Sequence, residues 1–481
     1  MIYIMFLVLS VAIIVLLIAE MGMQSYRQEI RYEDQVKVQR AWDGILAKID
    51  ADSQAGTLAT VPATYTVAMN GVSGTVTVSN NSSTIAATNI AAATLAAADG
   101  RTFPMSGLVA KPATGLTGTF WQTNATNILL VSDADDYVLT KSSPTGSFLG
   151  LLLNYSGTDS TLIKTWLGSD NSSYVGTNGS FNDGIVKLFG TITTTSPNTS
   201  IKVLSNDGSV LNVDGDNYQI NLDGTHASTS GTVNIPLAGT YPLQLTYFNH
   251  YTGIGTTSLQ LQWKTDLSYV SIPTSALNFN PQVWTFNSSA ATFGNGVQLV
   301  TGVNSQAGSA WLNTKQTITS FHAAFTFNIG GNKAADGFTF CIQNYGLNAL
   351  GSNAGYLGYA TSITPSAAIK FDIYSNSGEG TNSTGLYTNG AIPYSTSSQN
   401  IGSLSTNPDL NSGDTIHCTL AYSGTTLTET ITDEDNGNTY THSYTVNLGT
   451  VLGATTAYVG FTGGTSGANC TIPVIDFTFG P

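Results

Sequence analysis

From residue 52 onward the chain consists of short segments in which apolar or β-branched residues alternate with polar ones. Segments such as TYTVAM (64–69) and GTVTVS (74–79) have a period of two, and glycine or asparagine separates them. Alternate side chains of a strand point to the same face, so this period predicts half-buried β-strands joined by tight turns. We therefore expect a mostly β protein, with one Ala-rich helical piece near residues 85–98.

The composition favours a folded extracellular β protein over a disordered chain. Only 9% of the residues are charged, and glycine alone occupies 50 positions. Turns need Gly and Asn, and strands favour Thr. Apolar and aromatic residues recur in short runs throughout, so there is apolar surface to bury. The length of 481 residues is too great for one hydrophobic core, and it predicts about three domains.

Beyond residue 50 the chain is acidic, with ten Lys and Arg residues against 23 Asp and Glu residues. Nucleic-acid binding needs clustered basic residues that displace the counterions of the phosphates. The charge balance therefore excludes nucleic acid as a partner. An acidic surface is compatible with neutral ligands or with calcium.

The first 19 residues carry no charge, and as a helix they would span roughly 28 Å, about the core of a bilayer. A cleaved secretory signal would need a basic start and a small-residue cleavage site, and neither is evident. An ordinary membrane anchor would place the basic residues at 27–40 in the cytoplasm, although the rest of the chain has an extracellular character. The secretory-signal interpretation conflicts with the first residues, and the membrane-anchor interpretation conflicts with the extracellular character of the rest.

An amphipathic helix is predicted for residues 20–51, directly after the apolar run. Val38, Trp42, Ile45 and Ile49 fall on one face at steps of three and four residues. A helix of this kind, at residues 1–51 and followed by a β-rich head, resembles type IV pilins and pseudopilins. The resemblance implies self-association through the helix, although the glutamate usual near the mature terminus of major pilins is absent. A plain membrane anchor at residues 1–19 remains the alternative, and residues 52–112 are expected to form a small β-rich stalk.

Residues 113–278 resemble the β-sandwich domain named after anthrax protective antigen. The segments that carry this resemblance are GLTGTFW (115–121), SNDGSVLNVDG (205–215) and AGTYPLQLTYF (238–248). Sugar-binding members of that family hold calcium with two adjacent aspartates, and the corresponding pair here is Asn206–Asp207. The resemblance leaves two possibilities open, a second calcium-assisted sugar site or a structural spacer whose Asp residues shape turns.

Residues 281–481 contain four separate segments that together resemble the site loops of L-type (legume) lectins. They are ADG (335–337), AGYLGY (354–359), KFDIYSNSGEG (370–380) and FTGGTSG (461–467). The resemblance implies a jelly roll of two sheets, with a sugar site formed by loops and a metal ion that holds one of them. The whole chain is thus expected to be mostly β, with a helix, a stalk, a sandwich and a jelly roll in that order.

The resemblance also implies a role for each loop. Asp336 would follow a cis peptide bond and accept hydrogen bonds from sugar hydroxyls, while the backbone N–H of Gly355 would contact the sugar. The amide of Asn376 would bind the sugar, and the ring of Tyr374 would offer a stacking face. The fourth loop, with Gly463, Gly464 and Thr465, would set specificity.

Calcium is the cofactor that the third loop predicts. Asp372, the carbonyl of Tyr374, and Asn376 have the family's spacing, and Glu379 stands where the family has a bridging acid. Hard oxygen ligands of these kinds suit calcium. Legume lectins hold a second, transition metal through a glutamate and a histidine, but the corresponding positions here are Lys370 and, approximately, Thr384. An ammonium group repels a divalent cation, so we expect calcium alone.

We find no pattern that indicates an enzyme. Jelly-roll glycoside hydrolases need two carboxylates about 5–9 Å apart, and the chain beyond residue 50 has only three glutamates, Glu379, Glu429 and Glu434. The five histidines form no HExxH motif. The three cysteines have no metal-type spacing; buried free thiols are expected, with one disulfide and a free thiol as the alternative.

Together these features predict a surface-anchored, calcium-dependent carbohydrate-binding protein whose partners are glycans or polysaccharides. The expected location is the cell surface or the extracellular space, on a membrane or on a pilus-like filament. A structural subunit of such a filament, with the β domains as decoration, is the alternative function. The sequence leaves open the sugar, the oligomeric state and whether Met1 is the mature terminus.

Overall fold

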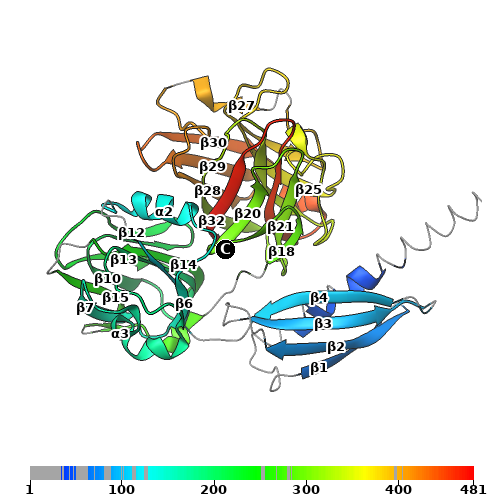
Figure 1. The fold of residues 1–481 in the computed structure, drawn as a ribbon. Helices are drawn as coiled ribbons and strands as arrows, with labels where there is room; N and C mark the ends of the chain where they lie inside the picture. The colour runs from blue at the N-terminus through cyan, green and yellow to red at the C-terminus, as the bar shows by residue number, and fades with distance from the viewer. Residues whose placement is uncertain are drawn as a thin grey trace, which may run out of the picture. The chain divides into compact units, whose positions relative to one another are not determined.

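The computed structural model describes residues 34–49, 63–123 and 128–480, with short gaps at 35–36, 43, 47, 70, 81–87, 99, 101, 111–114, 251–254, 267, 279–281, 283, 395–397 and 404. Most of these residues lie in strands, so the expected mostly β fold is confirmed (Figure 1). They form two compact units, of which one ends at residue 112 and the other begins at residue 113.

The first unit is an antiparallel sheet with helical residues packed on it. Its strands pair in chain order: β1 (Ala63–Met69), β2 (Val72–Asn80), β3 (Thr88–Ala96) and β4 (Thr102–Ala110). The described residues between 34 and 49 are helical, and Val38, Trp42 and Ile49 are buried in one cluster with Val76 of β2. The predicted amphipathic face is therefore the face that packs on the sheet. The apolar segment 1–19 lies outside the described residues, and no helix among those described is long and apolar enough to cross a membrane.

The helix expected near residues 85–98 is wrong for the part that the structure describes. Residues 88–96 form β3, which pairs with β2 on one side and with β4 on the other. Alanine favours a helix only weakly, by a few tenths of a kcal/mol per residue. Pairing with a strand on each side and the burial of Leu95 outweigh that preference.

The second unit begins with a two-sheet sandwich. One sheet has the order β13-β10-β15-β16, with β7 also paired to β15, and the other has the order β12-β11-β14-β9-β5-β6-β8, with β17 paired to β9. The elements are β5 (Leu116–Gln122), α2 (Val131–Leu139), β6 (Gly146–Gly150), β7 (Asn154–Thr158), α3 (Ile163–Trp166), η1 (Gly168–Ser173), β8 (Val175–Gly176), β9 (Gly184–Thr194), β10 (Thr199–Asn206), β11 (Ser209–Val213), β12 (Tyr218–Leu222), β13 (Thr229–Ile235), β14 (Gly239–Phe248), β15 (Thr256–Lys264), β16 (Tyr269–Ser271), η2 (Thr274–Ala276) and β17 (Leu277–Asn278). Stacked rings of Trp166, Phe181 and Tyr247 lie in its core.

A second sandwich follows, and it contains the four predicted site loops. Its front sheet has the order β18-β21-β31-β24-β25-β26-β27, with β22 paired to β31, and its back sheet has the order β19-β20-β32-β23-β28-β29-β30. The elements are β18 (Trp284–Ser288), β19 (Ala291–Phe293), β20 (Gly296–Thr301), β21 (Ala307–Leu312), β22 (Gln316–Thr317), β23 (Ser320–Phe327), β24 (Gly337–Gln343), η3 (Ala354–Tyr356), β25 (Ser366–Asp372), β26 (Ser383–Thr388), β27 (Gln399–Asn400), η4 (Ile401–Ser403), β28 (Ile416–Ser423), β29 (Thr426–Asp433), β30 (Thr439–Thr445), α4 (Leu448–Leu452), β31 (Thr456–Gly464) and β32 (Thr471–Gly480).

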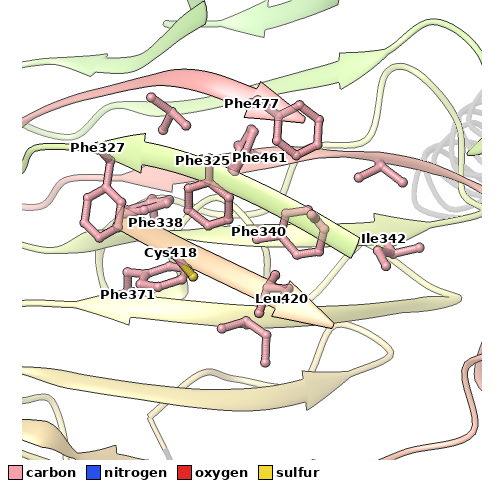
Figure 2. Close-up of a cluster of buried hydrophobic side chains, with 14 of the residues drawn as sticks. Phe325, Phe327, Phe338, Phe340, Ile342, Phe371, Cys418, Leu420, Phe461 and Phe477 are labelled. Carbon is pink, nitrogen blue, oxygen red and sulfur yellow. The ribbon is translucent and has the colours of Figure 1, made fainter. Parts of the chain in front are cut away.

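Phenylalanine rings from both sheets fill this second sandwich. Figure 2 shows the rings contributed by the front sheet and by the back sheet, which are Phe338, Phe340, Phe371 and Phe461, and Phe325, Phe327 and Phe477. Adjacent rings lie edge-to-face or stacked, with centroids such as those of Phe325 and Phe461 5.1 Å apart. All three cysteines are free and buried, as expected. Such a core holds the strand ends that carry the site in fixed register.

The two sandwiches of this unit share a buried junction. One hydrophobic cluster joins Trp121, Val138 and Phe248 of the first sandwich to Phe293 and Ile475 of the second. A fully buried lysine, Lys187 of β9, lies in the same junction. Its ammonium contacts one carboxylate from each sandwich, Asp135 of α2 at 2.5 Å and Asp476 of β32.

Candidate functional site

Three strand ends meet at one edge of the front sheet. Gly337, the first residue of β24, lies opposite Asp372 on β25 and opposite Gly464 on β31. Because β24 is antiparallel to both neighbours, the loop before β24 and the loops after β25 and β31 emerge together. Three of the four predicted loops are therefore adjacent in space, although up to 130 residues separate them in the sequence.

Asp336 precedes β24 and is almost completely buried, with 1% of its surface exposed. The peptide bond between Ala335 and Asp336 is cis. Its backbone N–H donates to the carbonyl of Gly464 at 3.3 Å, and its carbonyl accepts from the N–H of Ile373 at 2.9 Å. Burial raises the pKa of the Asp336 carboxyl to about 6, and a hydrogen bond from the Ser466 side chain opposes the rise. Its Oδ2 atom is buried without a partner, which leaves an acceptor available to a ligand.

The second loop places Gly355 against Asn376. The N–H of Ala354 donates to the carbonyl of Thr465 at 3.0 Å, which fixes η3 on the end of β31. A Cβ atom on Gly355 would collide with the side-chain amide of Asn376. The absence of a side chain at this position lets the two loops approach, and it brings two of the predicted sugar-binding residues together.

The third loop is folded by its own carboxylates. Oδ1 of Asp372 accepts from the N–H of Tyr374 at 3.0 Å. The two oxygens of Glu379 accept from the N–H groups of Asn376 at 3.0 Å and Ser377 at 2.6 Å. The Tyr374 side chain lies on the surface, and 44% of the residue is exposed. The loop thus presents an aromatic ring outward and buries its acids.

Lys370 lies inside this group of acids and is fully buried. Its Nζ atom is 3.1 Å from Oδ2 of Asp372 and 3.9 Å from Oε1 of Glu379. Burial raises the pKa of the Asp372 carboxyl to about 7, even though the ammonium of Lys370 opposes the rise. The centroid of the Tyr387 ring is 6.0 Å from the Nζ atom of Lys370.

Thr384 does not face Lys370 and the acids around it. The prediction that it stands at the position of the transition-metal ligand is therefore wrong. Strand register pairs Asp372 with Ser383 and Phe371 with Thr384, and directly opposite residues of a sheet share a face. Thr384 therefore points into the core, where its hydroxyl donates to Glu429 at 2.8 Å. The residue beside Asp372 on β26 is Ser383, whose buried Oγ has no hydrogen-bond partner.

In the fourth loop, the three residues predicted from the sequence to set specificity make mostly structural contacts. Gly463 faces Leu299 in the interior, and Gly464 faces the carbonyl of Ala354. Thr465 is buried, and its hydroxyl donates to the carbonyl of Val303 at 2.8 Å. These three residues shape the loop, whereas the residues that follow, at 466–469, reach the surface.

A fifth segment that sequence reasoning missed supports the fourth loop. The loop between β20 and β21, which connects the back sheet to the front sheet, contributes Gln306, whose N–H donates to Oγ1 of Thr465 at 2.9 Å. Asn304 of the same loop accepts from the side chain of Asn469 at 2.6 Å. No motif marks these residues, because only the pairing of β21 with β31 brings them to the site.

The donors of the third loop fit calcium and do not fit a transition metal. Asp372, the carbonyl of Tyr374, Asn376 and Glu379 offer oxygen atoms only, which suits a hard cation. A transition metal would want imidazole or further carboxylate ligands, but the face of the sheet beside Asp372 offers Lys370 and Ser383.

The first sandwich does not present the carboxylate pair that its resemblance would require. Oδ1 and Oδ2 of Asp207 accept from the backbone N–H groups of His226 at 3.2 Å and His250 at 2.9 Å. The side chain of Asn206 donates to Thr256 at 2.8 Å. Asp207 has a positive φ of 67° and lies in the turn between β10 and β11. The second sugar site and the structural spacer both stay predictions.

Fold and site together define a β-sandwich domain, whose candidate site is built by loops at one edge of a sheet. The family model of the legume lectin domain matches residues 248–479, so the C-terminal region is similar to that domain. The match begins at the end of β14, in the first sandwich, whereas the first strand of the second sandwich begins at Trp284.

Solved structures with partial similarity include two lectins and a domain from an adhesin. Lectin I-B4 from Griffonia simplicifolia, in its metal-free form, is 21% identical with a TM-score of 0.35, over 41% of this chain and 92% of that chain. The lectin from Bauhinia forficata in complex with GalNAc is 24% identical with a TM-score of 0.35, over 41% and 91%. The PA14 sugar-binding domain from an RTX adhesin is 18% identical with a TM-score of 0.31, over 35% and 99%. Similarity at this level transfers no ligand.

Proposed function

We propose that the C-terminal sandwich binds carbohydrate through the loops at the end of β24. The observation that carries the proposal is the convergence of Asp336, Gly355 and Asn376, with one buried oxygen of Asp336 left without a partner. A buried polar atom without a partner costs about 1–3 kcal/mol. A hydroxyl-rich ligand would satisfy it, because each sugar hydroxyl can donate one hydrogen bond.

Each of the converging residues has a distinct task in this proposal. The carboxylate of Asp336 accepts hydrogen bonds from hydroxyls, and the amide of Asn376 donates to one. The exposed ring of Tyr374 offers an apolar face to the C–H groups of the sugar. Gly355 has no side chain, which lets the ligand reach the backbone.

Calcium is proposed as the cofactor of the third loop, held by Asp372, Tyr374, Asn376 and Glu379. When bound, the ion supplies a fixed positive charge that orients the loop. Asp372→Ala should abolish calcium binding and weaken sugar binding, while the second sandwich keeps its fold. Calorimetry on the full chain checks this, and an unchanged sugar affinity in excess chelator would contradict the calcium dependence.

The central experiment is Asp336→Asn, which keeps the size of the side chain and replaces one acceptor with a donor. A charge-assisted hydrogen bond contributes about 1.5–3 kcal/mol, so affinity should fall about 10- to 150-fold. The melting temperature should not fall, because Asn removes a carboxylate that is costly to bury. Asp266→Asn, at an exposed turn, is the matched control. Equal glycan-array signals for wild type and Asp336→Asn would refute the proposed site.

The proposed activity is binding without catalysis. Of the three glutamates beyond residue 50, Glu379 folds the third loop and Glu429 lies between the sheets, where the hydroxyl of Tyr444 donates to it at 2.9 Å. Glu434 lies in the junction, 3.9 Å from His417. No two of these glutamates face one another across the candidate site.

We also propose that the N-terminal segment attaches the β domains to a cell surface or to a pilus-like filament. The support is the uncharged run at 1–19 and the helical face that packs on the first sheet. Protein beginning near Gly115 should bind the same glycans as the full chain and should no longer associate with cells. In the alternative, a filament subunit, electron microscopy of cells would show a helical array instead of scattered copies.

A further inference from the structure

Lys370 is a buried cation placed where the proposed carbohydrate site needs one. It lies on β25, two residues before Asp372, and none of its surface is exposed. A buried ammonium is stable only when it is paired. The carboxylates that pair with it are those of Asp372 and Glu379, which are also two of the proposed calcium ligands.

The charges of this group leave room for one divalent ion and no more. The carboxylates of Asp336, Asp372 and Glu379 and the ammonium of Lys370 sum to a formal charge of −2. One calcium ion balances that charge. A second divalent ion would leave an excess of +2 in a buried site and would lie close to the ammonium, so it would be repelled.

The available donor atoms also argue against a second metal ion. Strand register places Ser383, and not Thr384, beside Asp372 on the neighbouring strand. A neutral hydroxyl is a weak ligand for a transition metal, and β26 offers on this face neither the imidazole nor the further carboxylate that such a metal prefers. The site therefore lacks the ligands for a second metal as well as the charge to hold it.

We propose that the Lys370 ammonium takes the place of a second metal ion and makes this a single-calcium site. The lysine holds Asp372 and Glu379 together permanently, so one cation of the site is a side chain of the protein itself. Lys370 is thus a positioning residue for the proposed sugar site, and the inference rests on the calcium-dependent binding proposed above.

The test counts metal ions directly and does not use sugar binding as its readout. The full chain is loaded with Ca²⁺ and Mn²⁺ together, freed of unbound ions and measured by inductively coupled plasma mass spectrometry. Wild type should hold one Ca²⁺ and no Mn²⁺ per chain. Lys370→Glu combined with Ser383→His should hold one Ca²⁺ and one Mn²⁺. Lys315→Glu, remote in sequence and placed beside the ring of Tyr458, is the matched control and should behave as wild type.

A second measurement keeps the proposal testable if the double variant fails to fold. Lys370→Met removes the charge and keeps the length of the side chain. In the absence of metal it should melt below wild type, because the buried carboxylates of Asp372 and Glu379 lose their cation. Two divalent ions in wild type, no divalent ion in wild type, or equal melting of Lys370→Met and wild type would overturn the proposal. Loss of glycan binding with a count of one Ca²⁺ would instead refute the proposed function alone.

Discussion

Replacing Lys187 with methionine tests how strongly the two sandwiches of the second unit depend on each other. The ammonium of Lys187 is fully buried on β9, and it contacts Asp135 from the first sandwich and Asp476 from the second. Burial raises the pKa of the Asp135 carboxyl to about 7, although Lys187 opposes the rise. The Asp135 carboxylate therefore depends on this lysine for its charge.

The magnitude follows from what the substitution leaves behind. Lys187→Met keeps the length and the apolar stem but leaves two buried carboxylates, 4% and 1% exposed, without their cation. Removing one partner of a buried ion pair costs about 3–5 kcal/mol. The folded-state pKa of Asp135 should rise further, so the variant should regain stability as the pH falls through that value.

Urea denaturation of the full chain, followed by tryptophan fluorescence, provides the assay. Trp121 and Trp166 report on the first sandwich, and Trp311 reports on the second. The transitions of both sandwiches should move to lower urea in Lys187→Met, and adding Asp135→Asn and Asp476→Asn should restore much of the loss. Lys141→Met, at an exposed lysine, is the control. A loss below about 1 kcal/mol would refute the view that this cluster joins the sandwiches.

Two further predictions concern the same junction and the site. Burial lowers the pKa of His417, but Asp216 at 2.7 Å and Glu434 outweigh it and raise the pKa to about 9. The ion pair should therefore stabilise the fold fully below about pH 6.5 and lose its contribution as the pH rises through about 9. His417→Asn should cost about 3 kcal/mol of stability at pH 6 and nothing near pH 10. Denaturation experiments at both pH values will check this. Gly355→Ala should lower glycan affinity at least about tenfold, because its Cβ displaces the amide of Asn376; isothermal titration checks this, and an unchanged affinity would contradict the placement of Gly355.

The sequence by itself determined the class of the fold and the loops in which a site is predicted. The period of two in segments such as 74–79 dictates strands, because a strand buries every second side chain. Asp336, Asp372 and Asn376 could be named because the short segments around them resemble the site loops of legume lectins. The buried helical face at Val38 and Trp42 was predictable from a period near 3.6.

Residues whose roles arise between strands could not be found this way. Alanine-rich residues 88–96 form a strand because two neighbours pair with them, and no local propensity records those neighbours. Gly463 and Thr465 look like exposed loop residues in the sequence, yet β31 turns one inward and Val303 ties down the other. Gln306 carries no motif at all.

Only the tertiary structure decided the electrostatics of the molecule. Lys370 reads as a missing metal ligand in the sequence, and in the fold it becomes the cation that pairs with Asp372 and Glu379. Lys187 is one of fifteen lysine and arginine residues until β9 places it between carboxylates of two sandwiches. The physical reason is that an isolated charge costs too much to bury, so its role depends on partners that only folding brings within reach.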